Sequence, residues 1–156
     1  MAAFPVGLYA LTPDEPDTAV LAAKVRAAIA GGATAVQYRN KQAPARLRQE
    51  QALTLAVLCR GAGVPLLVND DVELALAVAA AGVHLGRDDG DLAAARRRLG
   101  PGRLLGASCY DRFEFAERAV AAGADAIAVI TSLFEAGDVA ARARAFTDLF
   151  KRKAAA

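Results

Sequence analysis

A repeating alternation of short apolar runs with longer amphipathic stretches constrains this chain more than any other feature. One unit of the repeat takes about 25 residues, which is typical of βα units whose strands lie parallel in one sheet. We expect strands at 6–11, 34–38, 65–68, 83–85, 104–107 and 126–130, and helices at 17–30, 44–61, 72–80, 92–99, 112–122 and 139–150. The sequence therefore predicts an α/β fold with six visible βα units.

Composition sets the scale of the molecule and excludes several classes of partner. The 156 residues are 55% hydrophobic and 23% charged, which suits one buried core, so we expect a single domain over 1–156 with a disordered tail at 151–156. The net charge is only +2 and the charges are scattered, which argues against a nucleic-acid partner. The one dense basic run, Arg96 to Arg98, ends a predicted helix, where positive charge complements the helix dipole.

Neither cysteine belongs to a recognisable motif. Cys59 and Cys109 show no CxxC or His/Cys ligand spacing, so the sequence indicates neither a disulfide framework nor a zinc site. Cys109 also lacks a neighbouring base, and we assign it no nucleophilic role. No basic leader and no long apolar segment is visible, so we expect a cytoplasmic protein without a membrane partner.

Polar side chains follow the second predicted strand where it gives way to its loop. Gln37, Tyr38, Arg39, Asn40 and Lys41 lie there, at the strand edge where parallel α/β proteins build their sites. Gln37, Arg39 and Lys41 alternate on one face of an extended segment, and their amide, guanidinium and ammonium donors suit phosphate oxygens. The alternative interpretation is that Arg39 and Lys41 are solvated loop charges.

The third predicted strand ends in the same way, with Asn69, Asp70 and Asp71. A carboxylate at this edge suits a hard cation, whereas Asn and Asp residues are also common helix caps. The cap and the metal ligand are about equally favoured for Asn69 and Asp70 taken alone. Together with the donors of the preceding strand, these residues suggest a site for a diphosphate and its Mg²⁺.

The next two strands add polar groups at the same edge. Asp91 fits the N-cap of the following helix, which leaves Asp89 or Asp88 to face a cation. Ser108 adds a hydroxyl after the next strand, although a serine there is more often a turn or cap residue. The one histidine, His84, lies in an apolar run with no catalytic partner in view, which favours a buried, hydrogen-bonded histidine over an acid–base role.

Four motifs, in this order along the chain, resemble the signatures of the thiamine-phosphate synthase family. They are Gln-Tyr-Arg-Asn-Lys at 37–41, Gly-Val-Pro-Leu-Leu-Val-Asn-Asp-Asp at 63–71, Gly-Val-His-Leu-Gly-Arg-Asp-Asp at 82–89, and Gly-Ala-Ser at 106–108. The resemblance extends over residues 4–125. It implies a TIM barrel that joins hydroxymethylpyrimidine diphosphate to thiazole phosphate, with Mg²⁺, through a dissociative mechanism that releases pyrophosphate.

The resemblance also implies roles for individual residues, none of them a general acid or base. Asp70 and Asp89 would hold Mg²⁺, and Ile130 and Thr131 would bind thiazole phosphate through backbone amides. The residues that would bind the pyrimidine diphosphate are Gln37, Tyr38, Arg39, Asn40, Lys41, Asn69 and Ser108.

The resemblance breaks after residue 125. The loop after the family's sixth strand and its seventh unit have no counterpart, whereas 126–134 and 138–150 resemble its eighth strand and last helix. The resemblance therefore implies that an internal stretch of an eight-unit barrel is missing, and six strands would leave the ring distorted, open or completed by another subunit.

Three functions stay open at this point. They are a transferase, whose activity could be restored in a homo-oligomer, a noncatalytic binder of the pyrimidine diphosphate, and a relative of the thiazole tautomerases. The motifs at 37–41 and 69–70 argue against the third, because tautomerases generally lack the pyrimidine-diphosphate residues.

Overall fold

A computed structural model describes residues 3–5, 8–86, 90–110, 113–129, 138, 141, 145–146 and 148–150. Strands and helices alternate along the described chain, as the sequence predicts. The strands are β1 (Leu8–Leu11), β2 (Ala33–Tyr38), β3 (Leu66–Asn69), β4 (Gly82–Leu85), β5 (Leu104–Tyr110) and β6 (Ala126–Val129). The helices are α1 (Thr18–Ala30), α2 (Ala45–Gly61), α3 (Val72–Ala77), α4 (Leu92–Leu99) and α5 (Phe113–Ala121).

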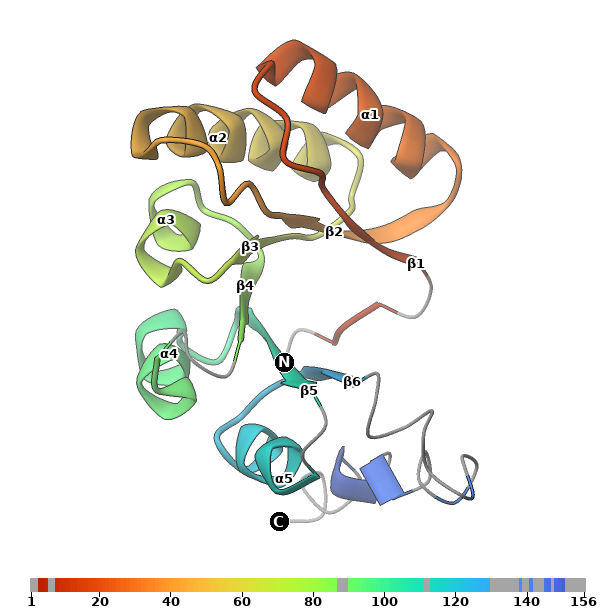
Figure 1. Ribbon diagram of the computed structural model, residues 1–156, viewed down its shortest axis with the longest axis vertical. Helices are drawn as coiled ribbons and strands as arrows, with labels where there is room; N and C mark the ends of the chain where they lie inside the picture. The colour runs from red at the N-terminus through yellow and green to blue at the C-terminus, as the bar shows by residue number, and fades with distance from the viewer. Residues whose placement is uncertain are drawn as a thin grey trace.

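The six strands form one parallel sheet in chain order, from β1 to β6. The sheet curls into a half-barrel, and the labelled helices α1 to α5 cover its outer side (Figure 1). Within the described residues, β1 and β6 are the two edges of this sheet and do not pair with each other. The predicted α/β fold with six parallel βα units is confirmed, and within the described residues the sheet does not close into a ring.

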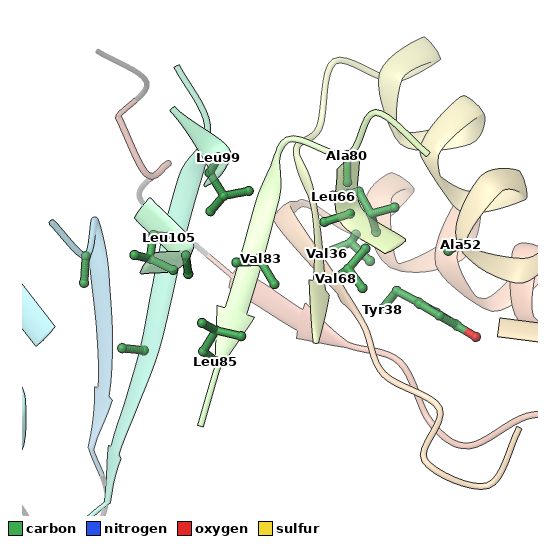
Figure 2. Close-up of a cluster of buried hydrophobic side chains, with 14 of the residues drawn as sticks. Val36, Tyr38, Ala52, Leu66, Val68, Ala80, Val83, Leu85, Leu99 and Leu105 are labelled. Atoms are coloured by element: carbon green, nitrogen blue, oxygen red, sulfur yellow. The ribbon is translucent and has the colours of Figure 1, made fainter. Parts of the chain in front are cut away.

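The hydrophobic core lies between the sheet and the helices. It takes every second side chain of the strands, including Val36, Val68, Val83 and Leu105, which gather in one layer (Figure 2). Leu55 of α2 is fully buried against this layer. Each such side chain contributes about 1.5–3 kcal/mol when it leaves water, so the helices are held mainly by this layer.

The intervening side chains face the concave side of the half-barrel, where strands approach one another closely. A Cβ atom added to Gly82 would lie 2.1 Å from the carbonyl oxygen of Leu104, so β4 and β5 need a glycine at this position. One added to Gly106 would lie 2.4 Å from Nδ1 of His84. His84 therefore occupies the concave side, and the glycine opposite it in β5 makes room for its ring.

Two boundaries differ from the sequence prediction by three residues each, whereas several others differ by one. Helix α3 ends at Ala77 instead of residue 80, because Ala79 adopts a left-handed φ of 52° and the amide of Ala80 bonds back to the carbonyl of Ala75. Strand β5 continues to Tyr110, three residues beyond the expected end at 107, so Ser108 lies inside the strand.

The predicted cap of α4 is confirmed. Asp91 is the N-cap of α4 and accepts the amide of Ala93 at 2.8 Å, as predicted. Much of the expected helix at 139–150 and the whole tail at 151–156 lie outside the described residues. Near the end of the described chain, Phe146 is buried with its ring 5.0 Å from that of Phe113.

In the described part of the chain, no helix has the length and apolar character needed to cross a membrane.

Candidate substrate site at the carboxyl ends of the strands

Strand β2 sends alternate side chains to opposite sides of the sheet. Gln37 is buried on the concave side, where its Nε2 donates to the Tyr9 hydroxyl at 2.9 Å. Arg39 and Lys41 continue this alternation past the end of the strand and are partly exposed. The structure therefore brings the predicted amide, guanidinium and ammonium groups to one edge.

Tyr38 and Asn40, also predicted as substrate ligands, turn the other way. Figure 2 shows the Tyr38 ring among the helix-facing side chains, and its hydroxyl donates to Oε1 of Gln51 at 2.9 Å. The Asn40 amide donates to the same Oε1 at 3.0 Å and to the carbonyl of Glu15 at 2.9 Å. Burial raises the pKa of Tyr38 to about 12. These two side chains belong to a buried network behind the edge, so our proposed site does not include them as contacts.

The end of β3 shows which residue caps the following helix. Asp71 is the N-cap of α3, and its carboxylate accepts the amide of Leu74 at 2.8 Å. Asp70 precedes this cap with a φ of 65°, a left-handed conformation that costs a non-glycine residue energy and is common at functional sites. Its amide donates to the carbonyl of His84 at 2.8 Å, and its Oδ2 lies 4.0 Å from Nζ of Lys41. The cap role thus falls to Asp71, and the Asp70 carboxylate lies near the ammonium group of Lys41.

A row of polar side chains lines the concave side below this edge. His84 is buried in β4, and its Nε2 shares a hydrogen bond of 2.9 Å with Oγ of Ser108 on β5. The Tyr9 hydroxyl lies 3.5 Å from Nδ1 of His84 and accepts the amide of Gln37. Burial raises the pKa of the Tyr9 phenol, and the hydrogen bond from Gln37 opposes this only in part. The predicted buried, bonded histidine is confirmed, although it lies on the concave side and not in the helix-facing core.

Sequence reasoning missed three residues that contact this group. Tyr9 in β1 faces the concave side, and its neighbours there come from β2 and β4. Thr12 and Asp14 follow β1 and bond to the backbone of Arg39 and Lys41. Their position directly after a predicted strand was the available signal, because it puts them at the same edge.

Of the other predicted ligands, only some lie within the described residues. Asn69 is the half-buried last residue of β3 and lies beside His84 in the sheet register. Asp89, Ile130 and Thr131 lie outside the described residues. Among the residues that are described, no group of three or more His, Cys, Asp or Glu side chains could hold a metal ion. Burial raises the pKa of the Cys109 thiol to about 12.

The fold and this edge define a parallel βα protein of the barrel class, with polar groups gathered at the carboxyl ends of its strands. The sequence profile of one family, described as thiamine monophosphate synthase, matches residues 8–135. The chain belongs to this family.

Curated relatives agree with the family profile. The chain is 53% identical over 146 residues to a thiamine-phosphate synthase of Aromatoleum aromaticum, covering 94% of this chain and 70% of the relative. It is 50% identical over 152 residues to that of Thiobacillus denitrificans, covering 97% and 72%. With the Chromobacterium violaceum enzyme it shares 60% identity over 122 residues, covering 78% and 59%. The chain thus matches roughly three fifths to seven tenths of the length of these relatives.

A solved structure shows a similar fold. The thiamine phosphate pyrophosphorylase from Pyrococcus furiosus aligns with a TM-score of 0.58 and 27% sequence identity, over 94% of this chain and 96% of that one. This likeness agrees with the half-barrel architecture and with the family assignment.

Proposed function

We propose that this chain condenses hydroxymethylpyrimidine diphosphate with thiazole phosphate to give thiamine phosphate and pyrophosphate. Membership of the family supports the activity. The observation that carries the assignment of the site is the approach of Lys41 on the β2 side to Asp70 on the β3 side, 4.0 Å apart. It supports the proposal because an ammonium group suited to phosphate oxygens and a carboxylate suited to a hard cation lie together at this edge.

The diphosphate is proposed to bind between the ends of β2 and β3. Arg39 and Lys41 would hold its oxygens, because both are partly exposed cations at the same edge. The pyrimidine ring would enter the concave side, where Gln37 and Ser108 offer polar contacts and Asn69 lies at the rim. Tyr38 and Asn40 would support this segment from behind, through the buried Gln51 network.

The residues at this edge fit a magnesium ion in the chemistry of their donors. Asp70 offers hard carboxylate oxygens beside the proposed diphosphate. Its carboxylate is not needed as the cap of α3, because Asp71 has that role. Asp70 and Asp89 would hold Mg²⁺ together with oxygens of the diphosphate, as is usual when an enzyme supplies one or two carboxylates. The bound ion would neutralise charge that builds on the leaving pyrophosphate.

The proposed reaction needs positioning and charge stabilisation and no general base. The bond between the pyrimidine methylene carbon and the diphosphate oxygen breaks, and its electron pair leaves with pyrophosphate. The thiazole nitrogen then donates its lone pair to the resulting carbocation. Arg39 and Lys41 would stabilise the departing anion, while the concave surface holds the pyrimidine. Ile130 and Thr131 would bind the thiazole phosphate through backbone amides, as the family resemblance implies.

An assay with both substrates tests this proposal. We expect thiamine phosphate to form only when both substrates and Mg²⁺ are present, with one pyrophosphate released for each product. Omission of either substrate or chelation of the metal is the control. Binding of the pyrimidine diphosphate without any product would refute the transferase and favour a noncatalytic binding protein, which is the alternative left by the partial coverage of the relatives. We further propose that the protein acts in the cytoplasm on these small molecules.

A further inference from the structure

The loop after β1 is bonded to the backbone that carries Arg39 and Lys41. We infer that Thr12 and Asp14 in this loop are positioning residues for the proposed diphosphate site, an inference that rests on the proposed function. Neither residue has to touch the substrate for this role. They would act by fixing the backbone from which the two cationic side chains extend.

The Thr12 side chain forms the hydrogen bonds that a neighbouring strand would otherwise form with Arg39. β1 ends at Leu11 and β2 at Tyr38, so Arg39 lies beyond the paired strands. The buried Thr12 hydroxyl accepts the amide of Arg39 at 2.9 Å and donates to the carbonyl of the same residue at 2.9 Å. A hydroxyl can do both because it has one donor and two acceptor sites. One side chain thus satisfies both backbone groups of the residue that carries the guanidinium.

The main chain and Asp14 extend this contact in both directions. The amide of Thr12 donates to the carbonyl of Gln37 at 2.9 Å. Farther along the loop, Oδ1 of Asp14 accepts the amide of Lys41 at 2.9 Å and lies 3.9 Å from Nη1 of Arg39. Because both Asp14 and Arg39 are about one third exposed, water screens their charge pair, and the bond to the Lys41 amide is the more important contact.

The far end of the loop is fixed as well. The carbonyl of Glu15 accepts two hydrogen bonds. One comes from Nδ2 of Asn40 at 2.9 Å, and the other from Nε2 of the fully buried Gln51 at 2.7 Å. The loop is therefore bonded to four of the five positions from 37 to 41, and Tyr38 is the exception in this segment. A segment held in this way loses little further freedom when its side chains bind an anion, which is the basis of preorganised affinity.

Thr12→Val is the test variant, because it keeps the shape of the side chain and removes the hydroxyl. We expect it to weaken calorimetric binding of Mg²⁺ hydroxymethylpyrimidine diphosphate about tenfold or more, since two backbone groups of Arg39 lose their partner. Thr12→Ser restores the hydroxyl and should bring affinity back to within about threefold of the wild type. The matched control is Thr34→Val at the opposite end of β2, where the hydroxyl donates only to the carbonyl of Leu8 at 3.3 Å.

Two further measurements separate positioning from general destabilisation. Amide hydrogen exchange at Arg39 and Lys41 should speed up in Thr12→Val and stay unchanged in Thr34→Val. The KM for the pyrimidine diphosphate should rise, while the KM for thiazole phosphate should not. If the wild type binds the diphosphate and Thr12→Val binds it equally well, the positioning role is refuted and the proposed function stands. If the wild type itself does not bind it, the proposed function fails instead.

Discussion

Replacing Arg96 with alanine should destabilise the protein far more than replacing Arg98, although both lie in the last turn of α4. The guanidinium of Arg96 reaches the carbonyls of residues 100, 103 and 123 at 2.6–3.1 Å and Oδ2 of Asp125 at 2.5 Å. That carboxylate oxygen also accepts the amide of Leu105 at 2.8 Å. Arg96 therefore joins the end of α4 to the start of β5 and to the turn before β6.

The expected magnitude follows from burial. The side chains of Arg96 and Asp125 are 20% and 17% exposed, whereas those of Arg98 and its partner Glu73 are 61% and 70% exposed. Breaking a buried charged pair costs about 3–5 kcal/mol, and partial exposure brings our expectation for Arg96→Ala to about 3 kcal/mol. The exposed pair should contribute about 0–1 kcal/mol. For a domain of this size, the first loss lowers the melting temperature by about 6–12 °C.

Urea denaturation followed by circular dichroism measures both free energies of unfolding. Each variant loses one positive charge from the same helix turn, so any effect on the helix dipole is common to both and cancels in the comparison. We expect the urea midpoint to fall clearly for Arg96→Ala and hardly at all for Arg98→Ala, with similar m values. Equal midpoints for the two variants would refute the assignment of Arg96 as the residue that holds these segments together.

Three further changes have defined outcomes. Gly82→Ala should destabilise the protein by several kcal/mol in the same urea assay, because its Cβ would meet the carbonyl of Leu104 at 2.1 Å; wild-type stability would contradict this close approach. Gln51→Leu should cost about 2–4 kcal/mol by removing the acceptor of the buried Tyr38 hydroxyl, and a neutral effect on the urea midpoint would show that this network is dispensable. Burial raises the pKa of Cys109 from 9.0 to about 12 and that of Tyr38 from 10.0 to about 12, so the folded state keeps protons that the unfolded state releases. Stability should therefore be full below pH 9 and fall as the pH rises toward 12, and an unchanged urea midpoint between pH 8 and pH 11 would contradict the buried, protonated state of these groups.

The fold could be predicted because parallel βα units leave a strong local pattern. Apolar runs separated by amphipathic stretches predicted the strands and helices, and short connections imply that consecutive strands are neighbours. The end of α3 could not be predicted, because the left-handed residue that terminates it is Ala79, where no glycine announces the turn.

The site was predictable to the extent that it depends on alternation along a strand. That rule groups Gln37 with Arg39 and Lys41, and it sends Tyr38 to the helix-facing side, where the structure places it. It could not reveal the partners, because Thr12 contacts Arg39, which lies 27 positions further along the chain, and no local pattern records such a contact. Nor could it identify Asp71 as the cap of α3, a role that it offered to Asn69 and Asp70, because Asn and Asp cap helices about equally well.

The arginine run illustrates the same limit. Its position at a helix end predicts a favourable interaction with the helix dipole, and that interpretation treats the three residues alike. In the structure they differ, because Arg96 is mostly buried among backbone carbonyls and Arg98 forms an exposed pair. Tertiary contacts between distant segments therefore decide how much each of these three arginines contributes to stability.

The central claim, that the ends of β2 and β3 form a magnesium-dependent diphosphate site, is tested most directly by calorimetric titration of hydroxymethylpyrimidine diphosphate. Asp70→Asn should abolish the Mg²⁺-dependent part of the binding, because an amide is a poor substitute for a carboxylate at a hard cation. Asp71→Asn is the matched control and should bind like the wild type, since asparagine caps helices as well as aspartate does. Equal Mg²⁺-dependent affinities for the wild type and Asp70→Asn, or no Mg²⁺-dependent binding by the wild type, would contradict the account.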